Sequence, residues 1–159
     1  MDQSEIMRRV IELSRQAVIG RHGGPFGAVV VKDGKIIAEA HNEVLSATDP
    51  TAHAELLAVR RACKALSRFE LSGSILYTNG SPCCMCMSSM LWARLDRIYY
   101  ILGMDESAAI GLGDADFYGD LAKPEDQRRI VPLSQLPALT DEARAVYHLW
   151  RDDPARMAF

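Results

Sequence analysis

The sequence contains Thr51-Ala52-His53-Ala54-Glu55 and, further along the chain, Pro82-Cys83-Cys84-Met85-Cys86. A neutral imidazole from His53 and thiolates from Cys83 and Cys86 form a three-ligand set for tetrahedral Zn²⁺. This set leaves a fourth position for water, which is typical of a catalytic rather than a structural site. Glu55 adds a carboxylate that can move protons at that water. The two stretches therefore predict a zinc site with its own general acid and base.

The spacing within the two stretches supports this interpretation. Proline is favoured in the first turn of a helix, so we expect Pro82 to open a helix on which Cys83 and Cys86 lie one turn apart on the same side. The positive end of that helix lowers the pKa of both thiols. His53 and Glu55 are two residues apart in the first turn of another helix, so one side chain can bind metal while the other faces the water.

Strands and helices alternate around these two stretches. Expected strands lie at residues 26–31, 36–40, 74–78, 97–101 and 130–133, and expected helices at residues 4–19, 52–66, 82–93 and 141–150. The first two strands are joined by a turn with Asp33-Gly34, which indicates a hairpin. The alternation predicts an α/β layered domain, and the hairpin makes its sheet mixed.

The composition of the chain argues against several classes of protein. The chain has 159 residues, of which 48% are hydrophobic and 25% charged, as in a globular domain with neither disorder nor a membrane span. The net charge of -3 gives no general attraction for nucleic acid. Three of the four cysteines lie within residues 83–86, which favours metal ligation over disulfides. The polar N-terminal residues do not form a secretion signal, and we expect a cytoplasmic protein.

The sequence resembles the cytidine deaminase superfamily, and within it the bacterial guanine deaminases and tRNA adenosine deaminases. The residues that carry the resemblance are Gly23-Gly24-Pro25-Phe26-Gly27-Ala28-Val29, Asn42, Asp49 to Glu55, Pro82 to Cys86 and Trp92-Ala93-Arg94. Asp114 and Lys123-Pro124 are features of the guanine deaminases, which are the more similar branch.

The resemblance implies a three-layer α/β/α sandwich around a five-stranded mixed sheet, and a homodimer. It implies one catalytic domain over residues 1–159, with residues 141–159 as a C-terminal helix and tail that cover an active site. It makes Asn42 a hydrogen-bonding residue and Phe26 a wall against the base. The implied substrate-binding set is Phe26, Asn42, Ala54, Asp114 and Phe159.

Two positions depart from the pattern of these relatives. Ser81 stands before the zinc-binding proline where guanine and tRNA adenosine deaminases usually have Glu, and fungal cytosine deaminases have Ser there. The chain ends in Phe159 where similar guanine deaminases can end in a tyrosine. Phe159 can stack on a base but cannot relay a proton.

The resemblance implies hydrolytic deamination of a free nucleobase or nucleoside, with guanine converted to xanthine as the favoured reaction. Cytosine, isoguanine, guanosine and ammeline remain alternative substrates. A tRNA adenosine deaminase is less favoured, because residues 151–156 mix acidic and basic side chains instead of forming a basic patch. A non-catalytic zinc-binding module is least favoured, because a structural site has no use for Glu55.

Overall fold

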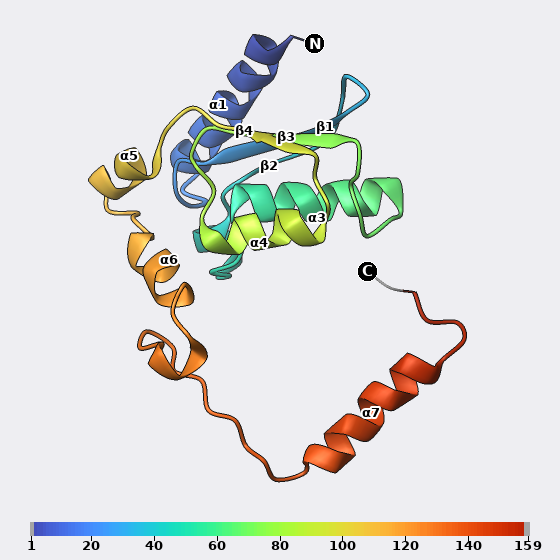
Figure 1. Ribbon diagram of the computed structural model, residues 1–159. Helices are drawn as coiled ribbons and strands as arrows, with labels where there is room; N and C mark the ends of the chain where they lie inside the picture. Colours follow the sequence, from blue (N-terminus) through green and yellow to red (C-terminus); the bar gives the residue numbers. More distant parts are fainter. Residues whose placement is uncertain (1, 158–159) are drawn as a thin grey trace. The chain divides into compact units, whose positions relative to one another are not determined.

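The computed structural model describes residues 2–157, so Phe159 lies outside the described residues. Figure 1 shows the course of the chain. The chain divides into two compact units, one ending at Ala115 and the other beginning at Asp116. The first unit contains the sheet and both sequence stretches. One catalytic domain with residues 141–159 over its site therefore stays a prediction.

The first unit is built on a mixed sheet. Its strands are β1 (Gly27–Lys32), β2 (Lys35–His41), β3 (Ser74–Thr78) and β4 (Arg97–Tyr99). Their order is β2-β1-β3-β4, with β1 antiparallel to β2 and β3, and β4 parallel to β3. Asp33 and Gly34 both have positive φ, 50° and 72°, which a type I′ turn requires. The predicted hairpin and mixed sheet are therefore confirmed.

The predicted fifth strand at residues 130–133 is wrong. Within residues 2–157 the sheet has four strands, and no ladder includes this segment. The backbone N–H of Ile130 instead donates to Oδ2 of Asp120 at 3.1 Å, and that of Arg129 donates to the same carboxylate. Pro132 has no N–H to offer. The hydrogen bonds that a strand would need are thus used locally or missing.

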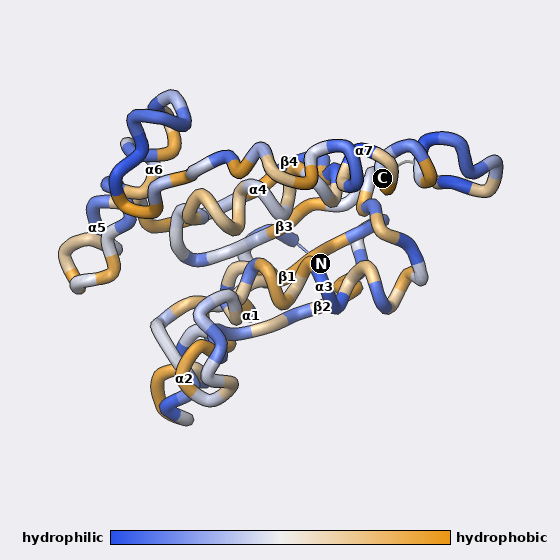
Figure 2. Tube along the Cα trace, turned by 90° about the horizontal axis from the view of Figure 1, so that it is seen from below, coloured by the Kyte–Doolittle hydropathy of each residue, from blue (hydrophilic) through white to orange (hydrophobic). Residues whose placement is uncertain are grey.

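Helices cover both faces of the sheet, as the three-layer prediction requires (Figure 1). On one face, α1 (Gln3–Ile19) packs Ile6, Val10 and Leu13 against Val29, Val31 and Tyr77. On the other face, α3 (Ala54–Leu66) and α4 (Cys84–Trp92) pack against a cluster that includes Ala28, Val30 and Leu76. Successive residues of β1 thus point to opposite layers. Its continuous apolar character, visible in Figure 2, is what burial on both faces demands.

Several short helices were not predicted from the spacing of apolar residues. They are α2 (Val44–Ala47), α5 (Met104–Ala109), α6 (Ala115–Leu121) and the 3₁₀ turn η1 (Glu125–Gln127). In the second unit, the expected helix at residues 141–150 is α7 (Thr140–Asp152). Between α6 and α7, the Asp120 carboxylate accepts hydrogen bonds from Lys123 Nζ at 2.9 Å and from the backbone N–H groups of Arg129 and Ile130. None of the helices in residues 2–157 is both long and apolar enough to cross a membrane.

Candidate active site

His53 lies at the N-cap of α3, one residue before the helix that we expected to contain it. Its backbone is extended (φ −69°, ψ 149°), and Ala54 and Glu55 are the first residues inside the helix. The placement within the first turn was therefore wrong by one position for His53. His53 Nδ1 still lies close to the cysteine sulfurs of α4, and the Glu55 side chain is buried. That His53 binds metal while Glu55 faces the water stays a prediction.

Cys83 is likewise the N-cap of α4, and Pro82 precedes it instead of standing in the first turn. The Cys83 Sγ accepts a hydrogen bond from the backbone N–H of Cys86 at 3.5 Å. A sulfur at an N-cap therefore takes the place of the usual oxygen acceptor and satisfies one free N–H of the helix. The same N–H groups stabilise negative charge on the sulfur before any metal binds.

The two thiols ionise unequally in the metal-free chain. The pKa of Cys83 is lowered to about 4, first by the thiol of Cys86 and then by the His53 ring and the backbone N–H of Cys86. The pKa of Cys86 is raised, because its proton is held against Cys83 and because it is buried near the charges of Glu55 and Cys83. The two thiols thus share one proton, which lies on the side of Cys86. Zinc binding would require both to be thiolates.

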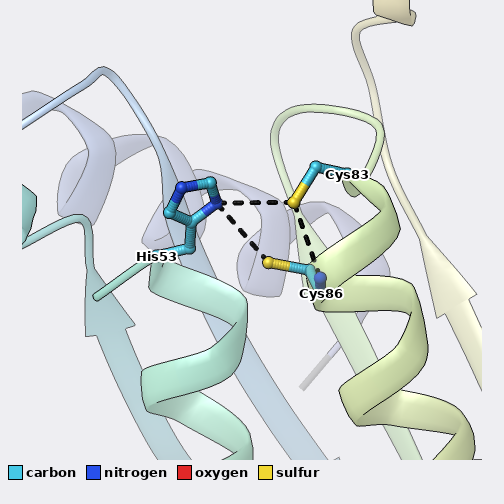
Figure 3. A group of neighbouring side chains, drawn as sticks. All are labelled: His53, Cys83 and Cys86. Carbon is cyan, nitrogen blue, oxygen red and sulfur yellow. Dashed lines mark hydrogen bonds between the residues drawn. The ribbon is translucent and has the colours of Figure 1, made fainter. Parts of the chain in front are cut away.

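The three predicted ligands meet at one point (Figure 3). His53 Nδ1 lies 3.6 Å from the Sγ atoms of both Cys83 and Cys86, and the three ligand atoms lie within 4.8 Å of one another. Tetrahedral zinc, with Zn–N near 2.0 Å and Zn–S near 2.3 Å, requires N···S separations of about 3.6 Å. The residues present thus fit Zn²⁺ and leave its fourth position open.

Glu55 lies beside this ligand set with only 4% of its surface exposed. Burial raises the pKa of its carboxyl from 4.5 to about 7, while its own backbone N–H and the charge of His53 act in the opposite direction. A carboxyl group with a pKa near neutrality can both accept and return a proton at physiological pH.

Asn42 is buried directly after β2, and its hydrogen bonds define its chemical role. Its Oδ1 accepts from the backbone N–H of Gly24 at 3.1 Å and from that of Val44 at 3.2 Å. These two bonds use both lone pairs and establish which atom is the oxygen. Its Nδ2 has no hydrogen-bond partner among residues 2–157. Asn42 can therefore offer a ligand a hydrogen-bond donor.

Asp114 belongs to the first unit and lies within electrostatic reach of the ligand set. Burial and then the negative charge of Cys83 raise its pKa. The pKa of His53 is raised first by its hydrogen bond with Cys83, and the carboxylate of Asp114 adds to this effect. Its Oδ2 is buried without a hydrogen-bond partner in the described part of the chain. A buried acceptor without a donor is costly unless another molecule supplies one. The arrangement suits a ligand with N–H groups.

The remaining predicted contacts are placed as follows. Phe26 packs against the core cluster that contains Ala54 and Cys86, and Ala54 is fully buried as the first residue of α3. Sequence reasoning missed Asn79, a buried amide directly after β3. An Asn-Gly pair is ordinarily interpreted as a turn, and only its position after an apolar strand could have indicated a buried role.

Comparison with known proteins adds an independent line of evidence. Residues 1–102 match the family described as the cytidine and deoxycytidylate deaminase zinc-binding region. The chain is 40% identical to a guanine deaminase of Bacillus subtilis over 152 residues, 96% of each chain. It superimposes on the X-ray structure of guanine deaminase from Bacillus subtilis with a TM-score of 0.93 and 38% identity, covering 100% of this chain and 99% of the other.

Two further relatives differ in how much they match. A tRNA-specific adenosine deaminase of Aquifex aeolicus is 43% identical over 76 residues, 48% of this chain and 50% of that one. A protein whose structure was solved in complex with 2,6-diaminopurine is 29% identical to this chain and superimposes on it with a TM-score of 0.64. The match covers 97% of this chain and 84% of that protein's chain.

Proposed function

The chain belongs to the cytidine and deoxycytidylate deaminase family, and from that premise we propose that it is a zinc-dependent aminohydrolase that converts guanine to xanthine and ammonia. The observation that carries the proposal is the buried Glu55 beside three side chains spaced for zinc. A structural zinc site has no need of a carboxyl group whose pKa is raised to about 7.

His53, Cys83 and Cys86 would hold the ion, and a zinc ion in such a site activates a water molecule for attack. Glu55 takes a proton from the attacking water and transfers it to the ring nitrogen next to the carbon under attack. Glu55 then takes the second proton from the hydroxyl group added to that carbon and passes it to the amino group, which leaves as ammonia as the C–N bond breaks. Water supplies the new carbonyl oxygen, so guanine and water give xanthine and ammonia in balance.

Two of the expected substrate-binding side chains complement a guanine-like base. Guanine presents N–H donors together with carbonyl and ring-nitrogen acceptors. The unpartnered Oδ2 of Asp114 would accept from an N–H of the base, and Nδ2 of Asn42 would donate to one of its acceptors. The backbone of Ala54 would approach the base from the start of α3, and Phe26 would form a wall against it.

The share of this chain that each relative matches favours a free base over tRNA as the substrate. The likeness to the Bacillus guanine deaminase extends over 96% of this chain, whereas that to the Aquifex tRNA-specific enzyme covers 48%. In the C-terminal segment Arg151 is paired with Asp152, with Nε to Oδ1 at 2.6 Å. A paired guanidinium offers little to a phosphate backbone.

The assembly and the C-terminal tail belong to the same proposal. We propose a homodimer, because α4 presents Leu91 and Trp92 with 72% and 67% of their surfaces exposed. A cytoplasmic location suits ligand thiols that must stay reduced.

Residues 141–159, with Phe159 at the end, are proposed to cover a substrate site, and removal of residues 150–159 should impair turnover without loss of zinc. Unchanged turnover after that truncation would refute the covering role.

Ammonia release from a panel of bases tests the function. The zinc-loaded chain should show its highest kcat/KM on guanine, against 2,6-diaminopurine, isoguanine, guanosine, cytosine, ammeline and adenosine in a tRNA stem-loop. Xanthine should appear in step with ammonia. A zinc-loaded chain that releases no ammonia from any of these compounds is not a deaminase of this kind, and a clear preference for another base would replace guanine as the substrate.

A further inference from the structure

We propose that Asn79 and Gly80, directly after β3, are positioning residues that hold the Phe26 ring in place and thereby determine how tightly the site binds its base. The inference rests on the proposed function, because it assigns Phe26 as the wall of the base site. Neither residue is expected to touch the reacting atoms. Both act through Phe26.

The side-chain amide of Asn79 holds the backbone on both sides of Phe26. Its Oδ1 accepts from the backbone N–H of Gly27 at 2.9 Å, and its Nδ2 donates to the carbonyl of Pro25 at 2.8 Å. Ser14 of α1 reinforces this clamp by donating to the same carbonyl at 2.8 Å. Asn79 has 8% of its surface exposed, so water does not compete strongly for these bonds.

Gly80 and Gly24 form a slot for the Phe26 ring. A Cβ on Gly80 would lie 2.8 Å from Cε1 and 3.1 Å from Cδ1 of the ring. A Cβ on Gly24 would lie 3.2 Å from Cδ2 and Cε2, on the opposite edge. Gly24 is itself tied to Asn42 through the bond from its N–H to Oδ1. The ring position thus depends on Gly80 at one edge and on a residue bonded to Asn42 at the other.

The same short segment leads into the metal site. Ser81 donates its backbone N–H to the carbonyl of Leu102 at 2.8 Å, and Cys83 follows two residues later as the N-cap of α4. The segment from Asn79 to Cys83 therefore carries both the clamp on Phe26 and a predicted zinc ligand. A base held between the wall and the ion is sensitive to displacements well below 1 Å.

Gly80→Ala is the most direct test, because its Cβ would lie 2.8 Å from Cε1 of the Phe26 ring, too close for the ring to keep its place. We expect KM for guanine to rise about tenfold while kcat changes less than about threefold, which is the signature of lost binding to a positioned wall. Zinc content and the melting temperature should stay near those of the unaltered chain. Gly119→Ala in α6 is the matched control, because its Cβ would meet nothing within 4 Å, and its KM should not change.

A double-mutant cycle with Phe26→Ala separates positioning from a general structural effect. If Gly80 acts through the ring, Gly80→Ala should raise KM in the unaltered chain but not in Phe26→Ala. Asn79→Asp keeps the acceptor for Gly27 but loses the donor to Pro25, and its effect on KM should likewise disappear without the ring. Equal effects in both backgrounds, or no effect on KM in either, would overturn the inference.

The two proposals can fail separately. If the unaltered zinc-loaded chain releases no ammonia from guanine or any other aminated base, the proposed function and this inference fall together. If it is active and the cycle shows no coupling to Phe26, only the positioning role is lost.

Discussion

Replacement of Glu55 by Gln separates the chemical role of this side chain from its effect on folding. Gln has the same shape but can neither take a proton from water nor return one. Proton transfer by a positioned group is worth about 10²- to 10⁴-fold in rate, and Glu55 is assigned two transfers, so turnover should fall by at least roughly a thousandfold. Zinc content should be unchanged, because Glu55 is not among the three ligand residues.

The same substitution should stabilise the metal-free chain at alkaline pH. Folding raises the pKa of Glu55 from 4.5 to about 7, so the folded chain binds this proton more tightly than the unfolded chain does. Its contribution to stability is complete below about pH 4.5 and is lost as pH rises through 7. At about 1.36 kcal/mol for each pKa unit, the buried carboxylate costs on the order of 3 kcal/mol at pH 8.

Two assays check these expectations. Ammonia release by the zinc-loaded protein measures turnover, and urea unfolding of chelator-treated protein at pH 5 and pH 8 measures the free energy of unfolding. Glu55→Gln should be the more stable protein at pH 8, with a smaller advantage at pH 5. Turnover within tenfold of the unaltered chain would refute the proton-transfer role, and equal stability at pH 8 would refute the buried, unfavourable carboxylate.

Three further predictions concern the metal, the substrate and the assembly. Alanine at His53, Cys83 or Cys86 should each abolish stoichiometric zinc in metal analysis, whereas Cys84→Ala should retain it; unchanged zinc in any of the three variants removes that ligand. Asp114→Ala should lower kcat/KM for guanine by about 10- to 100-fold, the value of a hydrogen bond to a charged acceptor, with zinc content retained; guanine turnover at the parent rate would end its assignment as the base acceptor. Sedimentation at working concentration should show a dimer, and a single species of 17.6 kDa would contradict it.

The candidate zinc ligands could be predicted from the sequence because part of the signal is local. Cys83 and Cys86 lie within one turn of the same helix, and the residue types alone define a zinc set. The Asp33-Gly34 turn and the apolar run of β1 were equally local signals, and both were confirmed. Helix boundaries were less accurate: His53 and Cys83 are N-caps, since a helix begins where the backbone leaves the extended region and not where the sequence motif begins.

Hydrogen bonds between side chains and the backbone of the folded chain could not be deduced in this way. The segment at residues 130–133 reads as a strand, yet the carboxylate of Asp120 binds its first N–H. Asn42 reads as both donor and acceptor, yet the backbone of Gly24 and Val44 occupies its oxygen.

By itself, the sequence indicated which chemistry to expect, because the residue types and their spacing within each of the two stretches are typical of a catalytic zinc site. That the two stretches meet depends on the packing of α3 against α4. Only the tertiary structure decided how a base would be held. That the Asn79 amide brackets Phe26, and that Gly80 leaves room for its ring, depends on β3 ending beside the turn before β1. Contacts of this kind depend on how strands that are distant in the chain pack together. The periodicity of apolar residues shows which face of a strand is buried but not which residues it meets there.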